Sequence, residues 1–284
     1  MINLKKVGHM QWRLLIIMNK IIIENDIVVQ TKLSSKVKLS FLEKNEDFIV
    51  NKLVIDMIGD SKLEIEYRND TALKLDILIR ISEGVKADIF EIRKGNLMKI
   101  QYRYDLDTNS SLSITKFYYI NGIKELDTIY LKGENSKIDY KLKTISTVRE
   151  KYDITVHHEG KNSESLIETN GVTVLNGTID FHVSGFVPNG KTGCVLNQNN
   201  RIVNLNEQKC SIHPNLFIDE YDVIANHSAF IGKFKEEELF YLESRGLSEA
   251  ESINLLVKGF LLSNLELSNK RKEEVNNIIN QYWR

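Results

Sequence analysis

Between about residue 20 and residue 230 the sequence alternates apolar and polar side chains with a period of two. In the segment 73–81, LKLDILIRI, every second residue is leucine or isoleucine, and the segment 99–104, KIQYRY, continues the pattern. Because successive side chains of a β-strand point to opposite faces, this alternation predicts strands with one buried and one solvated face. Similar short strands are predicted at 62–67, 111–115 and 137–142.

Short turn sequences separate the predicted strands. They read IGDS at 58–61, KGN at 94–96, NG at 121–122 and KGEN at 132–135. No helical pattern long enough for a crossover helix lies between them, which argues against a sheet that alternates with helices. A β-sandwich, a β-barrel and a β-helix all fit this pattern, and strand counting leaves the three folds open.

After residue 232 the sequence changes from a strand pattern to a helix pattern. The segment 235–246, KEEELFYLESRG, begins with acidic residues, which the positive end of a helix dipole favours. Gly246 stands where a helix commonly ends. We therefore predict a β-rich domain at 1–232 and a C-terminal helical domain at 233–284.

Two further helices are predicted after Gly246. Ser248 and Glu251 have the spacing of a capping box, in which each side chain accepts a hydrogen bond from the other residue's exposed amide. A third, more polar helix is predicted across 268–283. Its apolar face would be formed by Val275, Ile278, Ile279 and Tyr282.

The charge balance bears on the class of partner. The chain has 38 basic and 39 acidic residues and a formal net charge of −1. No overall positive field attracts nucleic acid or an anionic membrane, so we expect neither as a partner. The N-terminal stretch 1–23 is apolar, but Arg13 and Lys20 interrupt it, and no run reaches the roughly 20 apolar residues of a membrane span.

The six histidines and two cysteines are the candidates for metal or sulfur chemistry. No H-E-x-x-H or C-x-x-C spacing occurs, although His227 could meet Cys194 or Cys210 in space. His157 and His158 are adjacent, so they would point to opposite faces of a strand. Two cysteines do not make a disulfide framework, which favours a reducing compartment, the cytoplasm.

Motifs for enzymatic chemistry are weak. Ser163 and Ser165 lie near His158 in sequence, but neither stands in a G-x-S-x-G elbow. The segment 189–193, NGKTG, lacks the first glycine and the spacing of a phosphate-binding loop. The acidic run at 235–238 is better explained as a solvated first helical turn. The residues favour a binding or scaffold protein over an enzyme.

One long segment resembles a known protein family. Residues 214–260 read PNLFIDEYDVIANHSAFIGKFKEEELFYLESRGLSEAESINLLVKGF. This segment resembles the C-terminal signature of the SufB/SufD family, components of the SUF iron–sulfur cluster assembly machinery, and a looser likeness begins at about residue 155. The matching residues are Pro214, Leu216, Ile218, Asp222, Val223, His227, Ala229, Gly232, Leu239–Leu242, Ser244, Arg245, Gly246, Gly259 and Phe260.

The resemblance implies a fold and a role. The fold is a right-handed parallel β-helix followed by a small α-helical domain, a mainly β architecture. The role is that of a non-catalytic scaffold subunit that pairs with a SufB-type paralogue. Its C-terminal helices would bind the SufC-type ABC ATPase, and it would bind no nucleotide itself. Any iron–sulfur cluster would be transient and shared with the partner.

Within the family the chain is most similar to SufD, in a short and diverged form. SufB-type proteins carry a glutamate after the family histidine and a cysteine in the preceding strand, where this chain has Ser228 and Asn199. Both differences remove ligands that iron or sulfur would need. The alternatives are a homodimeric SufB-like scaffold that acts with the ATPase alone and a β-helical carbohydrate-active enzyme, and the chain could also self-pair when isolated.

The resemblance also implies site residues. His227 is the implied contact to metal or cluster, and Cys194 and Cys210 are further candidates for sulfur chemistry. Aromatic and arginine side chains are enriched at interface hot spots, and they stand among the implied ATPase-docking residues. These are Glu238, Phe240, Tyr241, Arg245 and Gly246. The alternative is that Leu239, Phe240 and Leu242 only seal the helices onto the β core.

Overall fold

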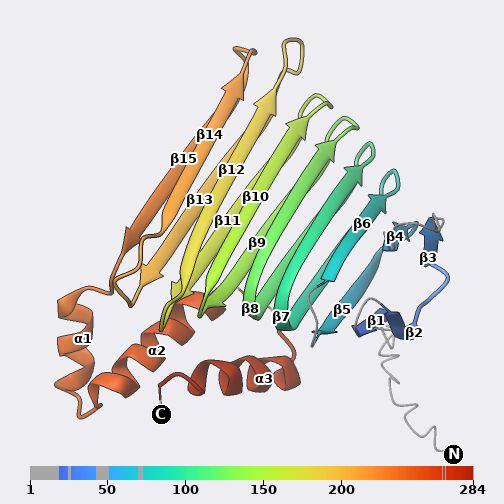
Figure 1. Ribbon diagram of the computed structural model, residues 1–284. Coiled ribbons are helices and arrows are strands. Elements are labelled where there is room, and N and C mark those ends of the chain that lie inside the picture. Colours follow the sequence, from blue (N-terminus) through green and yellow to red (C-terminus); the bar gives the residue numbers. More distant parts are fainter. Residues whose placement is uncertain are drawn as a thin grey trace, which may run out of the picture.

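The computed structural model describes residues 19–24, 27–42, 51–69, 73–263, 265 and 267–283. Over these residues the chain forms a parallel β-solenoid followed by three helices (Figure 1). This confirms the mainly β class and the β-helix with a helical C-terminal part. Most of the apolar N-terminal stretch, residues 1–18, lies outside the described residues. Among those that are described, no helix is long and apolar enough to cross a membrane.

The strands form two stacks that face each other across an apolar interior. Two long strands, β7 (Lys86–Leu106) and β8 (Ser111–Leu131), take part in both stacks. Sheet one also contains β1 (Asn19–Glu24), β2 (Ile27–Lys32), β5 (Ser61–Asn69), β9 (Lys137–Ser146), β11 (Glu164–Thr173), β13 (Cys194–Asn204) and β15 (Val223–Gly232). Sheet two also contains β3 (Val37–Leu42), β4 (Asn51–Met57), β6 (Leu73–Ile81), β10 (Arg149–His158), β12 (Thr178–Val187) and β14 (Ser211–Ile218).

The period-two pattern separates the interior of the solenoid from its outer faces. In β10 and β12 every second side chain is buried in the interior. Because the two strands pair in a parallel register, the buried residues of one lie beside the buried residues of the other. Tyr140, Tyr152, Ile167 and Phe181 pack there from four different strands. The interior is therefore a filled core, and the outer faces carry the polar half of each strand.

Two of the predicted turns are instead corners within long strands. KGN at 94–96 and NG at 121–122 lie inside β7 and β8, which continue from sheet one into sheet two. Gly95 and Gly122 have φ values of 134° and 96°, a region that residues with a Cβ rarely adopt. These glycines bend the strands without ending them, so the turn predictions were wrong there.

The three helices are confirmed as α1 (Glu236–Glu243), α2 (Glu249–Leu262) and α3 (Asn269–Asn280). The predicted capping box is formed, since the Glu251 amide donates to Ser248 Oγ and the Ser248 amide donates to Glu251 Oε2. Helices α2 and α3 cover part of the outer face of sheet one. The apolar side chains buried between this face and the two helices are Ile92, Phe117, Ile145, Val172, Val203, Val257, Leu261, Val275, Ile278 and Ile279. The predicted domain boundary coincides with the end of β15, and the division into two domains stays a prediction.

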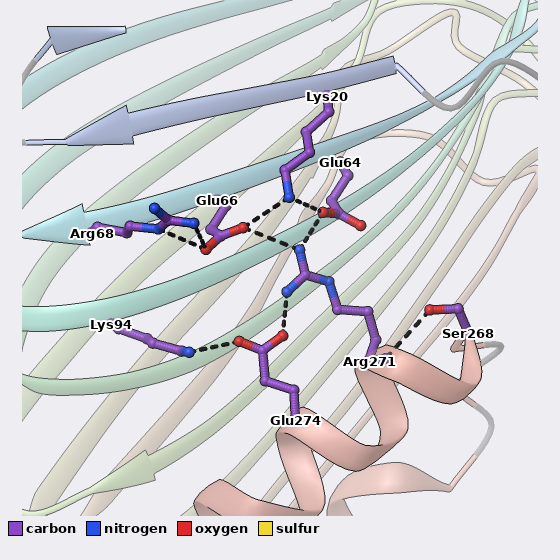
Figure 2. A network of polar contacts seen from close by, with 8 residues as sticks. All are labelled: Lys20, Glu64, Glu66, Arg68, Lys94, Ser268, Arg271 and Glu274. Carbon is purple, nitrogen blue, oxygen red and sulfur yellow. Dashed lines mark hydrogen bonds and ion pairs between the residues drawn. The ribbon is translucent and has the colours of Figure 1, made fainter. Parts of the chain in front are cut away.

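An ionic cluster fixes α3 to the first strands of the solenoid (Figure 2). The side chain of Arg271 is only 7% exposed, and it donates hydrogen bonds to Glu64 and Glu66 of β5. It also donates to Glu274 on its own helix, and Lys94 of β7 donates to Glu274 at 2.6 Å. These contacts connect residues about 200 positions apart in the chain, because the tail crosses the whole of sheet one.

Two further cations complete the cluster around Glu66. Lys20 of β1 donates to Glu66 at 3.0 Å, and Arg68 donates to the other carboxylate oxygen at 2.8 Å. Burial alone would raise the pKa of Glu66, but these hydrogen bonds outweigh it and lower the pKa to about 2. Because the folded-state pKa is depressed, this stabilising contribution is present at neutral pH and is lost as the pH falls from about 4.5 towards 2.

Replacing Arg271 with methionine is expected to destabilise the protein by about 1.5–3 kcal/mol, because hydrogen bonds to charged groups contribute about that much. Urea unfolding measures the change. The matched control is Lys272→Met on the exposed side of the same helix, which is expected to change stability by less than about 0.5 kcal/mol. Equal effects of the two substitutions would show that the cluster contributes nothing specific.

Candidate functional site

The last rung of the solenoid, formed by β14 and β15, is open on one side. In the described part of the chain β14 pairs only with β12, and β15 pairs only with β13. Each strand therefore presents a row of unpaired backbone N–H and C=O groups at its outer edge, which is a template for pairing with another strand.

The open rung lacks the charges that normally protect an edge strand. Neither β14 nor β15 contains a lysine, arginine, aspartate or glutamate, although 27% of the whole chain is charged. Natural edge strands commonly use such charges to prevent unwanted pairing. The rung instead exposes apolar side chains, namely Phe217, Ile224, Phe230 and Ile231. This property can be read from the sequence, but only once the structure shows which strands are last.

A column of stacked rings on the outer face of sheet two leads to this rung. Tyr130, His157, Phe186 and Phe217 stack on successive strands with centroid separations of 4.9, 5.1 and 4.6 Å. The column ends at Phe217, which is 52% exposed because none of the described strands pairs with the outer edge of β14. Sequence reasoning missed Phe217, since the other three rings of the column are far away in the chain.

His227 lies on β15 in the open rung. In the parallel register it pairs with Gln198, whose side chain is buried in the interior, so His227 belongs to the interior-facing row. It is nevertheless exposed, because no further rung covers it. The imidazole therefore stands at the mouth of the solenoid interior, where a partner that pairs with this rung would meet it.

Helix α1 is the most exposed of the three helices. It has no buried residue, and Phe240 and Tyr241 are 73% and 57% exposed. The Arg245 guanidinium lies 5.3 Å from the centre of the Tyr241 ring, and Gly246 ends the helix with a φ of 94°. Arg245 and Tyr241 are thus in contact, and Phe240 is exposed at the neighbouring position of the same helix. Glu238 serves as a cap, its carboxylate accepting a hydrogen bond from the Lys235 amide.

Phe240 does not seal the tail onto the β core, contrary to the alternative considered above. Phe240 is largely exposed, and Leu239 and Leu242 are partly exposed. The sealing is done by α2 and α3, whose apolar faces are buried against sheet one.

A sequence match to a protein-family model identifies the family of this chain. The model of the SUF system FeS cluster assembly, SufBD core domain, matches residues 79–260, which include the solenoid rungs from β7 onwards, α1 and most of α2. The chain belongs to the SufB/SufD family.

Three relatives show the extent of the likeness. The chain is 34% identical over 113 residues to the iron–sulfur cluster assembly protein SufD of Bacillus subtilis, covering 39% of this chain and 26% of that protein. It is 28% identical over 158 residues to a SufBD family protein of Galdieria sulphuraria, covering 54% of this chain and 72% of that protein. Over 44 residues it is 59% identical to a SufBD family protein of Pyrococcus horikoshii, covering 16% of this chain and 9% of that protein.

The two cysteines of this SufB/SufD family member lie away from His227. Cys194 is fully buried at the start of β13, with Sγ 3.4 Å from Ser163 Oγ. Cys210 is half-buried just before β14, at the end of the strands opposite to Cys194. Burial raises the pKa of its thiol. A raised pKa makes the thiolate scarcer, which weakens metal binding and sulfur chemistry. The described residues contain no group of three or more metal-ligating side chains that could hold an ion.

The structure does bring together His158, Ser163 and Ser165. The two ring nitrogens of His158 lie 2.8 and 2.9 Å from the two hydroxyl oxygens. All three side chains are buried, and burial lowers the pKa of His158 to about 4. The histidine is thus a neutral core residue with both nitrogens hydrogen-bonded. His157 points to the opposite, outer face, as the adjacency of the two residues predicted.

A groove of about 970 Å³ follows the beginnings of the sheet-one strands. Three of its four carboxylates are paired with lysines, as in Lys62–Asp88 at 2.8 Å and Lys137–Glu164 at 2.7 Å, and the fourth, Asp60, accepts a hydrogen bond from the Lys86 amide. A carbohydrate-active enzyme would need carboxylates that are free to act as acid and base. The groove is better explained as an outer face with ion pairs between successive rungs.

Proposed function

We propose that this chain is a non-catalytic, SufD-like subunit of an iron–sulfur cluster assembly scaffold in the cytoplasm. It pairs with a SufB-type paralogue through the open rung and binds the SufC-type ABC ATPase through α1. The observation that carries the proposal is the open, charge-free rung of β14 and β15, together with family membership.

The charges at the two ends of the rung favour an antiparallel partner strand. The loop that joins β14 to β15 carries Asp219, Glu220 and Asp222, whereas Lys209 and Lys233 stand at the opposite end of the rung. A related partner rung that runs antiparallel would place its basic end beside this acidic loop. Such complementarity fixes the orientation of a partner more than it adds affinity.

Helix α1 supports the ATPase contact. A helix of 8 residues is marginal in water by itself, and none of the residues of this one is fully buried against the rest of the chain. Its exposed aromatic pair, beside Arg245, has the composition of an interface hot spot. A SufC-type ATPase that covers Phe240 and Tyr241 would stabilise the helix. Movement of the bound ATPase would then be passed through α2 and α3 to the solenoid.

His227 is the residue of this chain that would contact the cluster. The cluster is the cargo of the system, and the neutral imidazole is a suitable ligand for iron. Cys194 and Cys210 would take no part, because Cys194 is buried and Cys210 lies just before β14, on sheet two rather than beside β15. Cluster ligands beyond His227 would come from the SufB-type partner.

The test is anaerobic co-expression with the SufB-type protein and the ATPase of the same organism, followed by mass measurement of the purified complex. A three-protein complex is expected. Phe240→Ala with Arg245→Ala should release the ATPase alone, and Phe217→Lys with Ile224→Lys should release the SufB-type protein alone. Loss of hot-spot residues costs about 2 kcal/mol or more, which corresponds to about 30-fold weaker binding.

The matched control is Leu126→Lys, an exposed apolar residue on the outer face of sheet two but on an inner strand. It should leave the complex intact. A chain that purifies without either partner would overturn the proposal. If it instead forms a complex of two copies with the ATPase and no SufB-type protein, the homodimeric scaffold replaces it.

A further inference from the structure

A group of charged side chains lies inside the closed interior of the solenoid, near the corners of β7 and β8. Arg93 and Lys116 supply two positive charges, and Glu91, Glu125 and Asp127 supply three carboxyl groups. All five residues are at most 1% exposed. If every group were ionised, the cluster would carry a net charge of −1 away from water. An uncompensated buried charge costs several kcal/mol, so neutrality requires one bound proton.

Hydrogen bonding shows which acid holds that proton. Tyr118 has one hydroxyl hydrogen, yet its oxygen lies 2.6 Å from Glu91 Oε1 and 2.8 Å from Glu125 Oε2. Arg93 donates to Glu91 at 2.6 Å and Tyr102 donates to it as well, as expected for an ionised carboxylate. Tyr118 therefore donates to Glu91, and the second contact needs a hydrogen that belongs to Glu125.

The remaining contacts agree with this assignment. Lys116 Nζ lies 2.6 Å from Glu125 Oε1 and 2.7 Å from Asp127 Oδ2, and 3.8 Å from the centre of the Tyr102 ring. Tyr140 also donates to Asp127 Oδ2. Asp127 thus accepts two hydrogen bonds on Oδ2, and its buried Oδ1 has no hydrogen-bond partner among the described residues. Within the described part of the chain, the only hydrogen-bond contact of Glu125 Oε2 is the one to Tyr118.

We propose that Glu125 is a proton-binding site in the interior of the solenoid. At neutral pH its carboxyl group is neutral and donates to Tyr118, which donates in turn to the ionised Glu91. Loss of the proton to solvent at alkaline pH leaves the cluster with one uncompensated negative charge. The strands that meet there, β7 and β8, then become less stable. This inference does not depend on the proposed scaffold role.

The electrostatic surroundings support the assignment. Burial and the neighbouring charge of Asp127 raise the pKa of Glu125 to about 8. Burial would also raise the pKa of Glu91, but Arg93 and Lys116 outweigh it and lower that pKa. The other titratable groups that face the cluster are Tyr67 of β5, Tyr102 and Tyr104 of β7, Tyr118 of β8, Tyr140 of β9, and Tyr152 and Glu150 of β10. Burial raises the pKa of each of these tyrosines, so all are neutral near pH 8.

Infrared spectroscopy of the carboxyl C=O stretch tests the proposal directly. The Glu150→Gln protein is used as the background, because Glu150 is a second buried acid. We expect a protonated-carboxyl band at pH 7 that disappears with a midpoint near pH 8. The band should be absent after Glu125→Gln is added. No band at pH 7, or a band that survives Glu125→Gln, would overturn the assignment.

Unfolding measurements provide the second readout. Because the folded-state pKa is raised, the folded protein keeps this proton between about pH 4.5 and 8 while the unfolded chain has lost it. The group should therefore lower the folding equilibrium constant about tenfold per pH unit over this window. Glu125→Gln should remove that slope, and the exposed substitution Glu164→Gln should leave it unchanged. An unchanged slope in Glu125→Gln would contradict the proposal.

Discussion

Replacing Lys116 with methionine is expected to destabilise the protein by about 3–5 kcal/mol. Lys116 is fully buried between Glu125 and Asp127, and methionine fills a similar volume without the charge. Removing one partner of a buried ion pair leaves the other charge uncompensated in a medium that solvates it poorly, and this costs about that much. Denaturant unfolding at pH 7 measures the loss.

The same substitution at Lys137 is the matched control. Lys137 forms an ion pair of similar length with Glu164, but on the outer face, where its side chain is 50% exposed. Exposed ion pairs contribute about 0–1 kcal/mol, so Lys137→Met should cost no more than that. Similar losses for the two variants would mean that burial of the charges inside the solenoid has no energetic consequence.

Replacing Glu150 with glutamine is expected to stabilise the protein by about 3 kcal/mol at pH 8 and by much less at pH 4.5. Burial raises the pKa of Glu150 to about 7, although hydrogen bonds from Thr144 and Tyr152 act in the opposite direction. One pKa unit corresponds to about 1.4 kcal/mol, and the shift from 4.5 spans about 2.5 units.

The sign follows from the direction of the shift. The folded protein holds the Glu150 proton more tightly than the unfolded chain, so this residue's contribution is fully favourable below about pH 4.5 and is lost as the pH rises through 7. Glutamine has the same shape and no proton to lose. Urea unfolding of both proteins from pH 4.5 to pH 8 should therefore give curves that separate steadily with pH. Parallel curves would show that the pKa of Glu150 is the same in the folded and the unfolded protein.

Local pattern was enough to predict much of the fold. Alternation located the strands, and the capping box of Ser248 and Glu251 located the start of α2. Strand counting left three β architectures open, because the alternation depends on which face is buried and not on how sheets close. Gly95 and Gly122 were mistaken for turns, since a glycine at positive φ serves a corner within a strand as well as a chain reversal.

The candidate site was predicted less completely. The motif around His227 and Arg245 located the family signature, and the structure places both residues on exposed surfaces. The open edge at Phe217 depends on the order of the strands in space, which no local pattern contains. The interior charges were also missed. Charged side chains normally lie on the solvated face of a strand, and the burial of Glu91 and Arg93 is possible only because partners arrive from other segments of the chain.

The attachment of α3 to β5 has a consequence for synthesis of the chain on the ribosome. A solenoid whose rungs touch only their neighbours can fold one rung at a time as it emerges. Here the apolar side chains on the outer face of sheet one, such as Phe117 and Val172, are covered by Val275 and Ile279 of the last helix. That face stays open to solvent, chaperones and other nascent chains until α3 has left the exit tunnel.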